Sequence, residues 1–120
     1  MNSSKRLLAA FFVLAGVLHF LRPREYEAMM PSYVPGHREA VAISGAAEIA
    51  GGLAVLPRRT RRAAGAWLVL LLAAVFPANL DMAIRPGRHR GLERVPRWAL
   101  WARLPLQPLI MLWAWRATRD

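Results

Sequence analysis

Apolar residues gather in four stretches of the chain, and charged or proline-containing segments separate these stretches. The stretches cover residues 7–21, 40–56, 63–84 and 98–115. A helix crosses the hydrocarbon core of a bilayer with about 20 residues, in a range of about 17–25. The last two stretches reach this length, and the first two reach it with their flanking residues. The pattern predicts an all-α fold, an integral membrane four-helix antiparallel bundle with short loops.

We therefore expect one domain over residues 1–120, with spans at 6–22, 39–56, 63–84 and 98–115. Tryptophans mark both ends of the fourth span, with Trp98 and Trp101 at one end and Trp113 and Trp115 at the other. At about 1.5 Å per residue, the two pairs are separated by roughly one hydrocarbon thickness. This spacing is typical of aromatic residues at the two interfaces of a membrane.

The first stretch also has features of a secretory signal, since Lys5 and Arg6 precede an apolar run. A cleavage pattern of the A-x-A type does not follow, and the run ends instead in His19-Phe-Leu-Arg-Pro23. This ending favours a membrane span over a cleaved signal.

The chain is strongly basic, with a net charge of +10. Such a charge would suit a nucleic-acid-binding protein if it covered one face of a soluble fold. Here the Lys and Arg residues lie at the ends of the apolar stretches, where lipid headgroups would meet them. We therefore expect a lipid bilayer and no nucleic acid as partner. The absence of cysteine excludes disulfides and thiolate metal sites within the chain.

Each apolar stretch carries polar residues that are costly in hydrocarbon, by about 2.5–3.5 kcal/mol for a charged side chain at the helix centre. The polar residues are His19, Ser44, Glu48, Asn79, Asp81, Arg103 and Gln107. Because successive spans alternate in direction, all of these residues fall in the same half of the bilayer. The sequence thus predicts one ligand-binding site formed by all seven residues, and it predicts no catalytic residue and no metal ligand.

Glu48 is the most informative of these residues, because Ser44, Glu48 and Gly52 share one helical face. It is either a ligand or proton site, or a residue that holds helices together. Arg103 cannot lose its proton, so a partner is expected, and Glu48 and Asp81 are the candidates. An internal ion pair that fixes helix packing is the alternative to a ligand contact. For His19 the alternative is a hydrogen-bonded imidazole near the interface.

Three prolines lie within the predicted spans, at positions 77, 105 and 108. Each removes a backbone donor and leaves the carbonyl four residues earlier without its partner, here those of Ala73, Trp101 and Leu104. Such breaks persist in a membrane when neighbouring groups or a wet cavity satisfy them. The prolines either shape a pocket or only kink the helices.

Several ordered motifs resemble the DoxX-like family of small bacterial membrane proteins. They are Gly16-Val-Leu-His-Phe20 with Pro23 and Tyr26, Met30-Pro-Ser-Tyr-Val-Pro35, Ser44-Gly-Ala-Ala-Glu-Ile49 with Gly52, Phe76-Pro-Ala-Asn79 and Arg103-Leu-Pro-Leu-Gln107. The resemblance covers residues 13–112 and implies a four-helix membrane bundle. It also implies partners in quinone-linked redox or oxidative-stress systems, whereas the lack of cysteine argues against thiol chemistry.

From these observations we expect a binding or accessory subunit that takes a quinone or another hydrophobic small molecule. Redox enzyme subunits and further copies of the chain are its possible protein partners. A scaffold with a purely packing polar cluster, and an oligomeric transporter of a small solute or protons, are the alternatives. The chain has no recognisable nucleophile–base pair, so the sequence assigns no enzymatic activity to the chain alone.

The expected location is the bacterial inner membrane, crossed several times. Both sides carry equal numbers of Lys and Arg, so this count does not decide the orientation. The dense cluster of four Arg residues at positions 58–62 and the basic N-terminus favour cytoplasmic termini.

Overall fold

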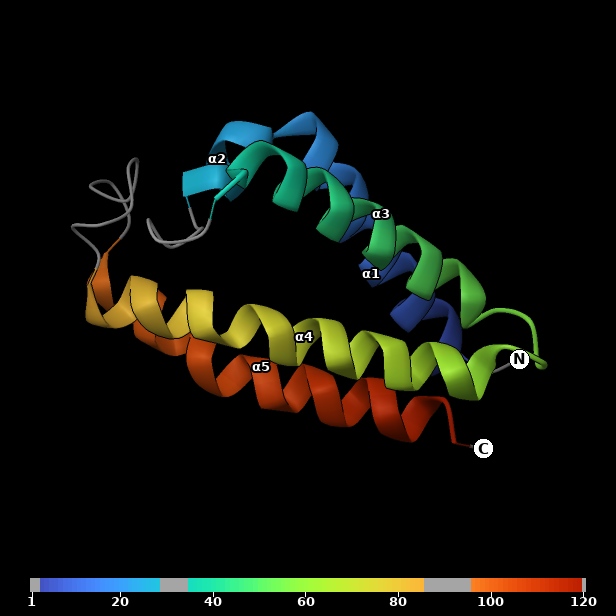
Figure 1. Cartoon of the computed structure of the whole chain (residues 1–120). Helices are drawn as coiled ribbons and strands as arrows, with labels where there is room; N and C mark the ends of the chain where they lie inside the picture. The colour runs from blue at the N-terminus through green and yellow to red at the C-terminus, as the bar shows by residue number, and fades with distance from the viewer. Residues whose placement is uncertain (1–2, 29–34, 86–95, 120) are drawn as a thin grey trace.

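The computed structural model describes residues 3–28, 35–85 and 96–119, and these ranges contain helices and no strand (Figure 1). The helices are α1 (Ser3–Leu21), α2 (Pro23–Ala28), α3 (His37–Ala54), α4 (Arg61–Ile84) and α5 (Arg97–Ala117). The prediction of an all-α fold with four long helices is confirmed, and each long helix begins and ends within one turn of a predicted stretch. The linking segments beyond residues 28 and 85 lie partly outside the described residues.

The short helix α2 was not predicted. It begins at Pro23, which occupies the first helical position. Proline suits this position because its fixed φ is already helical and its missing N–H would have no intrahelical partner. The helix continues directly from the end of α1 and lies over the start of α3 (Figure 1).

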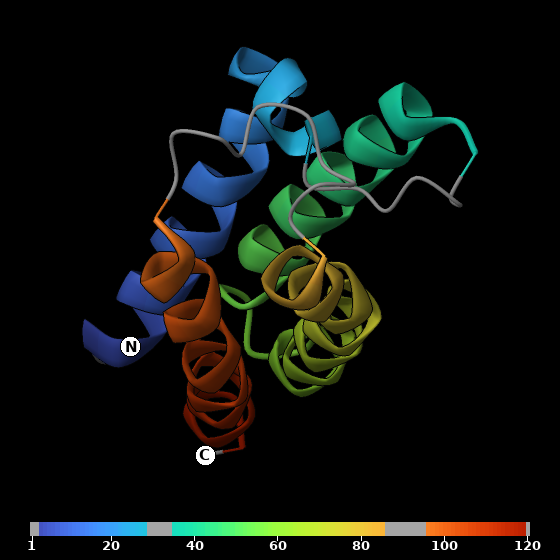
Figure 2. The same cartoon turned by 90° about the vertical axis from the view of Figure 1, so that its left-hand side faces the viewer.

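The four long helices form two antiparallel pairs, α1 with α3 and α4 with α5 (Figures 1 and 2). The pairs meet at the end that carries both termini and the turn between α3 and α4, which we call the closed end. They diverge toward the opposite end, which carries α2 and which we call the wide end. The antiparallel bundle expected from the sequence is therefore present, but it is open at one end.

Glycines hold α1 and α3 close together. A Cβ atom built on Gly16 would lie 2.6 Å from the carbonyl oxygen of Gly45, and one built on Gly45 would lie 2.7 Å from the Cβ of His19. About two turns toward the closed end, a Cβ atom built on Gly52 would lie 3.0 Å from the carbonyl oxygen of Ala9. Small residues at these positions allow the two backbones to approach to a distance that any side chain would prevent.

A core of apolar side chains fills the closed end. Leu8, Phe12, Val55 and Leu68 are its largest buried members, and they come from α1, the end of α3 and α4. A second, smaller cluster joins α4 to α5 at the wide end, with Met82, Ala83 and Leu100. Neither cluster fills the space between the helix pairs on the wide side, and the candidate site lies there.

Arg61 closes the end of α3. Its Nε donates to the carbonyl of Val55 and its Nη2 to the carbonyl of Leu56, both at 2.8 Å. The last carbonyls of a helix have no intrahelical partner and carry partial negative charge, so a guanidinium satisfies both needs. One arginine of the basic turn thus has a structural role in fixing the closed end.

Two of the described helices, α1 and α4, are long and apolar enough to cross a bilayer by length and composition. This is weak evidence for a membrane, because a buried core helix or a signal sequence can have the same properties. Helix α4 is not a buried core helix, however, since Leu70 on this helix is 68% exposed.

Replacement of Gly16 by Val tests the close approach of α1 and α3. We expect the free energy of unfolding to fall by about 1–3 kcal/mol, because the new side chain would overlap with Gly45 and Ile49. Thermal unfolding in detergent would measure the change. Ala10→Val on the exposed face of α1 is the matched control and should unfold like the parent chain. Equal loss in both variants would contradict the glycine contact.

Candidate functional site

A cavity of about 650 Å³ lies between the two helix pairs, and α1, α2, α3, α4 and α5 all contribute to its wall. Its size falls in the range of small-molecule sites, roughly 300–1,000 Å³. The cavity occupies the side on which the helix pairs diverge. The opening of the bundle described above therefore creates a space large enough for a ligand.

Six of the seven polar residues chosen from the sequence line this cavity. They are His19, Ser44, Glu48, Asn79, Arg103 and Gln107. They come from four helices, so only the folded bundle brings them together. The alternation of helix direction placed them at one level, and the structure also turns them toward one another.

The wall has a polar and an apolar part. On α1, His19 lies toward the wide end and Phe12 toward the closed end. On α5, Arg103 lies toward the wide end and Ile110 toward the closed end. The apolar part comprises Phe11, Phe12, Leu71, Val75, Leu106 and Ile110. Such a wall suits a molecule with a polar head and an apolar body.

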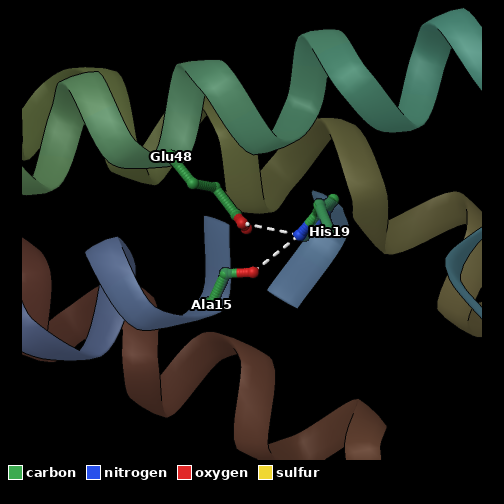
Figure 3. Close-up of polar contacts among 3 residues, drawn as sticks. All are labelled: Ala15, His19 and Glu48. Atoms are coloured by element: carbon green, nitrogen blue, oxygen red, sulfur yellow. Dashed lines mark hydrogen bonds and ion pairs between the residues drawn. The ribbon is translucent and has the colours of Figure 1, made fainter. Parts of the chain in front are cut away.

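His19 and Glu48 form the polar wall on the α1–α3 side (Figure 3). His19 Nδ1 lies 2.7 Å from the carbonyl oxygen of Ala15 and 3.3 Å from Oε2 of Glu48. A carbonyl can only accept, so Nδ1 carries a proton and donates it to Ala15. The same proton is poorly placed for Glu48, and Oε2 accepts no hydrogen bond from the described part of the chain. The contact is thus a close approach of a carboxylate and an imidazole without hydrogen-bond geometry, and it becomes an ion pair only when Nε2 of His19 is protonated as well.

This pair was not foreseen from the sequence. Glu48 and Asp81 were the two candidates for a partner of Arg103, and the structure places Oε2 of Glu48 3.3 Å from Nδ1 of His19. The physical reason is the close approach of α1 and α3 at Gly16 and Gly45, which places the two side chains across a short gap. The imidazole of His19 is hydrogen-bonded, as its alternative interpretation expected, and it also lines the cavity.

Tyr26 lines the site but was not among the predicted ligand-binding residues. Its ring stacks on that of His19, with centroids 3.9 Å apart and an interplanar angle of 23°, and it lines the cavity. It belongs to α2, within a segment expected to be a link. The available signal was its place in the motif from Gly16 to Tyr26 that resembles the DoxX-like family, and this motif does not say that the ring faces a cavity.

Asn79 and Gln107 form the polar wall on the α4–α5 side. Asn79 Nδ2 donates to Oε1 of Gln107, and Gln107 Nε2 donates to the carbonyl of Leu72. Leu72 precedes Pro77 in α4, and the sequence had indicated the carbonyl of Ala73 as the one left without a partner. The bond goes to Leu72 because Leu72 lines the cavity beside Gln107, whereas Ala73 is exposed.

Asp81, the seventh predicted residue, is not among the described residues that line the cavity. It is buried and forms an ion pair with Arg85, at 3.2 Å between Oδ1 and Nη1. Residues two positions apart in a helix point about 200° apart, so Asn79 and Asp81 cannot share a face. The sequence argument considered depth in the membrane but not rotation about the helix axis.

Arg103 lines the cavity one turn from Gln107, on the helical face that both residues were expected to share. It is half-buried. Its guanidinium has five N–H groups, so it can hold a partner within the protein and still donate to a ligand. Together with Asn79 it makes the α4–α5 wall rich in donors.

A family model described as a domain of unknown function (DUF8561) matches residues 8–118. No curated protein matches the chain. No solved structure matches it either. The resemblance to the DoxX-like family remains a prediction.

The link between Gln107 and α4 can be tested with Gln107→Met, which keeps the length of the side chain but removes its polar atoms. Gln107 is 3% exposed, so the variant removes two hydrogen bonds between α4 and α5 from a buried position and leaves the Asn79 amide without its partner Gln107. We expect a loss of about 1–3 kcal/mol in the free energy of unfolding, measured by thermal or chemical unfolding in detergent. Leu109→Met on the exposed face of α5 should have no comparable effect.

Proposed function

This chain belongs to the DUF8561 family, and we propose that it is an integral membrane protein that binds a lipophilic small molecule of the quinone type. The observation that carries the proposal is the cavity, in which polar side chains from four helices meet an apolar wall. The proposal has two parts, the membrane and the ligand, and each has its own support.

The membrane part is supported by the outer surface of the long helices. Large apolar side chains are exposed on all four of them, and they include Leu7, Leu14, Leu53, Leu70, Trp98, Leu109 and Leu112. Apolar surface of this extent marks contact with a membrane or with another protein. Its presence on every long helix favours lipid, since a protein partner would cover one side.

Helices α3 and α5 are less apolar than α1 and α4, and the polar residues that line the cavity account for this difference. Ser44 and Glu48 on α3, and Arg103 and Gln107 on α5, line the cavity. They lower the mean apolarity of their helices without placing a charge against acyl chains. Ionisable residues within membrane spans generally face the bundle interior in this way.

We propose that both termini and the α3–α4 turn lie in the cytoplasm. Arg58, Arg59 and Arg62 are exposed at the closed end, where the termini also lie. A dense group of arginines is retained on the cytoplasmic side and attracted by its anionic lipids.

The orientation gives a direct prediction, because the chain has no cysteine of its own. In intact cells, Arg38→Cys at the wide end should react with a membrane-impermeant maleimide. Ser3→Cys at the closed end should react only after the membrane is opened. Both positions are exposed. The opposite labelling pattern would reverse the orientation, and labelling of neither position after opening would contradict exposure at the surface.

The ligand part rests on the chemistry of the wall. Arg103 and Asn79 can donate to the carbonyl or hydroxyl oxygen of a ring, while the apolar part of the wall takes the ring and its substituents. Tyr26 and His19 add a stacked aromatic surface. A quinone has this combination of a polar, planar head and an apolar body, and the resemblance to the DoxX-like family favours the same class.

In this proposal the chain is an accessory subunit of a quinone-linked redox or oxidative-stress system. The expected test is a titration of purified protein in lipid nanodiscs with a short-tailed quinone such as a decyl benzoquinone. Tryptophan fluorescence or calorimetry should show saturable binding with one site. A response that rises without saturation, as for partition into lipid, would reject the ligand part and leave the membrane part standing.

A structural scaffold is the second candidate function. The bonds of Gln107 to Asn79 and to Leu72 favour it, because they join α4 and α5 without any ligand. In that case the unfolding temperature of the protein should not respond to any lipophilic ligand, although Gln107→Met would still lower it.

A further inference from the structure

The two walls of the cavity differ in hydrogen-bonding character, and this difference defines the ligand more narrowly. The α4–α5 wall has more donors than acceptors, because Arg103 carries donors only and Asn79 and Gln107 carry both. The α1–α3 wall presents the carboxylate of Glu48 beside His19 (Figure 3). A head group that spans the cavity would therefore meet donors on one side and an acceptor on the other.

The carboxylate of Glu48 is short of donors. Its side chain is 14% exposed and lines the cavity, and Oε2 accepts no hydrogen bond from the described residues. The Nδ1 proton of His19 lies near Oε2, but the carbonyl of Ala15 accepts it at 2.7 Å. A buried carboxylate can accept about four hydrogen bonds and is costly to leave without them. A donor on the ligand would relieve this cost.

The amide side chains retain capacity for the other side of a ligand. The NH2 group of Asn79 has two protons, and one is used on Gln107. The NH2 group of Gln107 likewise uses one proton on Leu72. Each amide keeps a second proton, so an acceptor on the ligand can be bound without breaking the bonds between α4 and α5.

The charges of the wall balance. Among the described lining residues, Glu48 and Arg103 carry formal charges of opposite sign, and His19 adds none while its imidazole is neutral. A cationic head attracted by Glu48 would meet Arg103, and an anionic head attracted by Arg103 would meet Glu48. A neutral head avoids both conflicts.

We infer that the ligand has a neutral head group with a hydrogen-bond donor as well as an acceptor, as in a hydroquinone or another lipophilic phenol. The donor hydroxyl binds Glu48 on the α1–α3 wall, and the oxygen at the opposite side accepts from Arg103 or Asn79 on the α4–α5 wall. The inference rests on the proposed ligand-binding function. It adds that a hydroxyl-bearing molecule binds more tightly than the corresponding quinone or ether.

The test compares 4-octylphenol with 4-octylanisole, in which a methyl group replaces the proton of the phenol hydroxyl. In nanodiscs, the parent chain should bind the phenol about tenfold more tightly, as expected for one hydrogen bond to a charged acceptor. Glu48→Met should remove this preference. Glu48→Gln keeps an acceptor without the charge, so it should retain a smaller preference for the phenol, of about threefold. This variant keeps the test decisive if Glu48→Met does not fold. Octylamine should bind no better than the anisole.

The outcomes separate the inference from the proposed function. Saturable binding of the phenol and the anisole with equal affinity would overturn the inference but leave a lipophilic site. A preference that is unchanged in folded Glu48→Met would overturn the role of Glu48. Failure of both compounds, and of the quinone, to saturate would remove the ligand-binding function itself. Tight binding of octylamine would show that the head group is a cation and would also overturn the inference.

Discussion

Ala78→Trp is expected to lower the affinity for a lipophilic ligand by at least about tenfold, equivalent to about 1.4 kcal/mol. Ala78 lies on α4 and lines the cavity, one residue before Asn79. An indole at this position would extend into the space between the helix pairs and exclude a ligand. Because the cavity can hold the new ring, we expect the free energy of unfolding to change little.

The matched control is Ala73→Trp on the same helix. Ala73 is exposed and does not line the cavity, so its indole should face outward and leave binding unchanged. Titration of both variants in nanodiscs with decyl benzoquinone and 4-octylphenol gives the comparison. If both variants lose binding alike, the effect comes from α4 as a whole and the cavity is not the site.

Arg103→Met is the second variant with a large expected effect. A hydrogen bond from a charged donor contributes about 1.5–3 kcal/mol, so the affinity for a quinone carbonyl should fall by about 10- to 100-fold. Methionine keeps much of the apolar stem that packs in α5. The expected result is therefore a folded protein with weakened binding, measured by the same titration and by thermal unfolding.

Arg116→Met supplies the control for Arg103→Met, since Arg116 is exposed near the closed end of the same helix. It should bind the ligand like the parent chain. Unchanged affinity in Arg103→Met would remove this guanidinium from the site. A large loss of stability in Arg103→Met with normal binding would instead support the structural role of the polar residues.

The sequence was sufficient to predict the long helices, because each apolar stretch is bounded by charged residues or proline. It also predicted that His19, Glu48 and Arg103 would come together, since alternating helices bring them to one level and the cost of burial turns them inward. These arguments use only length, direction and polarity, which a single sequence contains.

The particular partners could not be predicted in this way. The pairing of Glu48 with His19 depends on the close contact of Gly16 with Gly45, and the glycines alone do not say which helix they face. The exclusion of Asp81 depends on helix rotation, which a count of residue spacing from Asn79 would have shown. The stacking of Tyr26 depends on the short helix α2, whose six residues have no periodic pattern.

Native mass spectrometry of the chain extracted gently from its membrane tests the central claim most directly. The account predicts a protein ion that carries one neutral lipophilic molecule, present in the parent chain and in Ala73→Trp and absent from Ala78→Trp. The same adduct in all three proteins would place the molecule outside the cavity. No adduct in any of them, together with no uptake of added decyl benzoquinone or 4-octylphenol, would contradict a ligand site between the helix pairs.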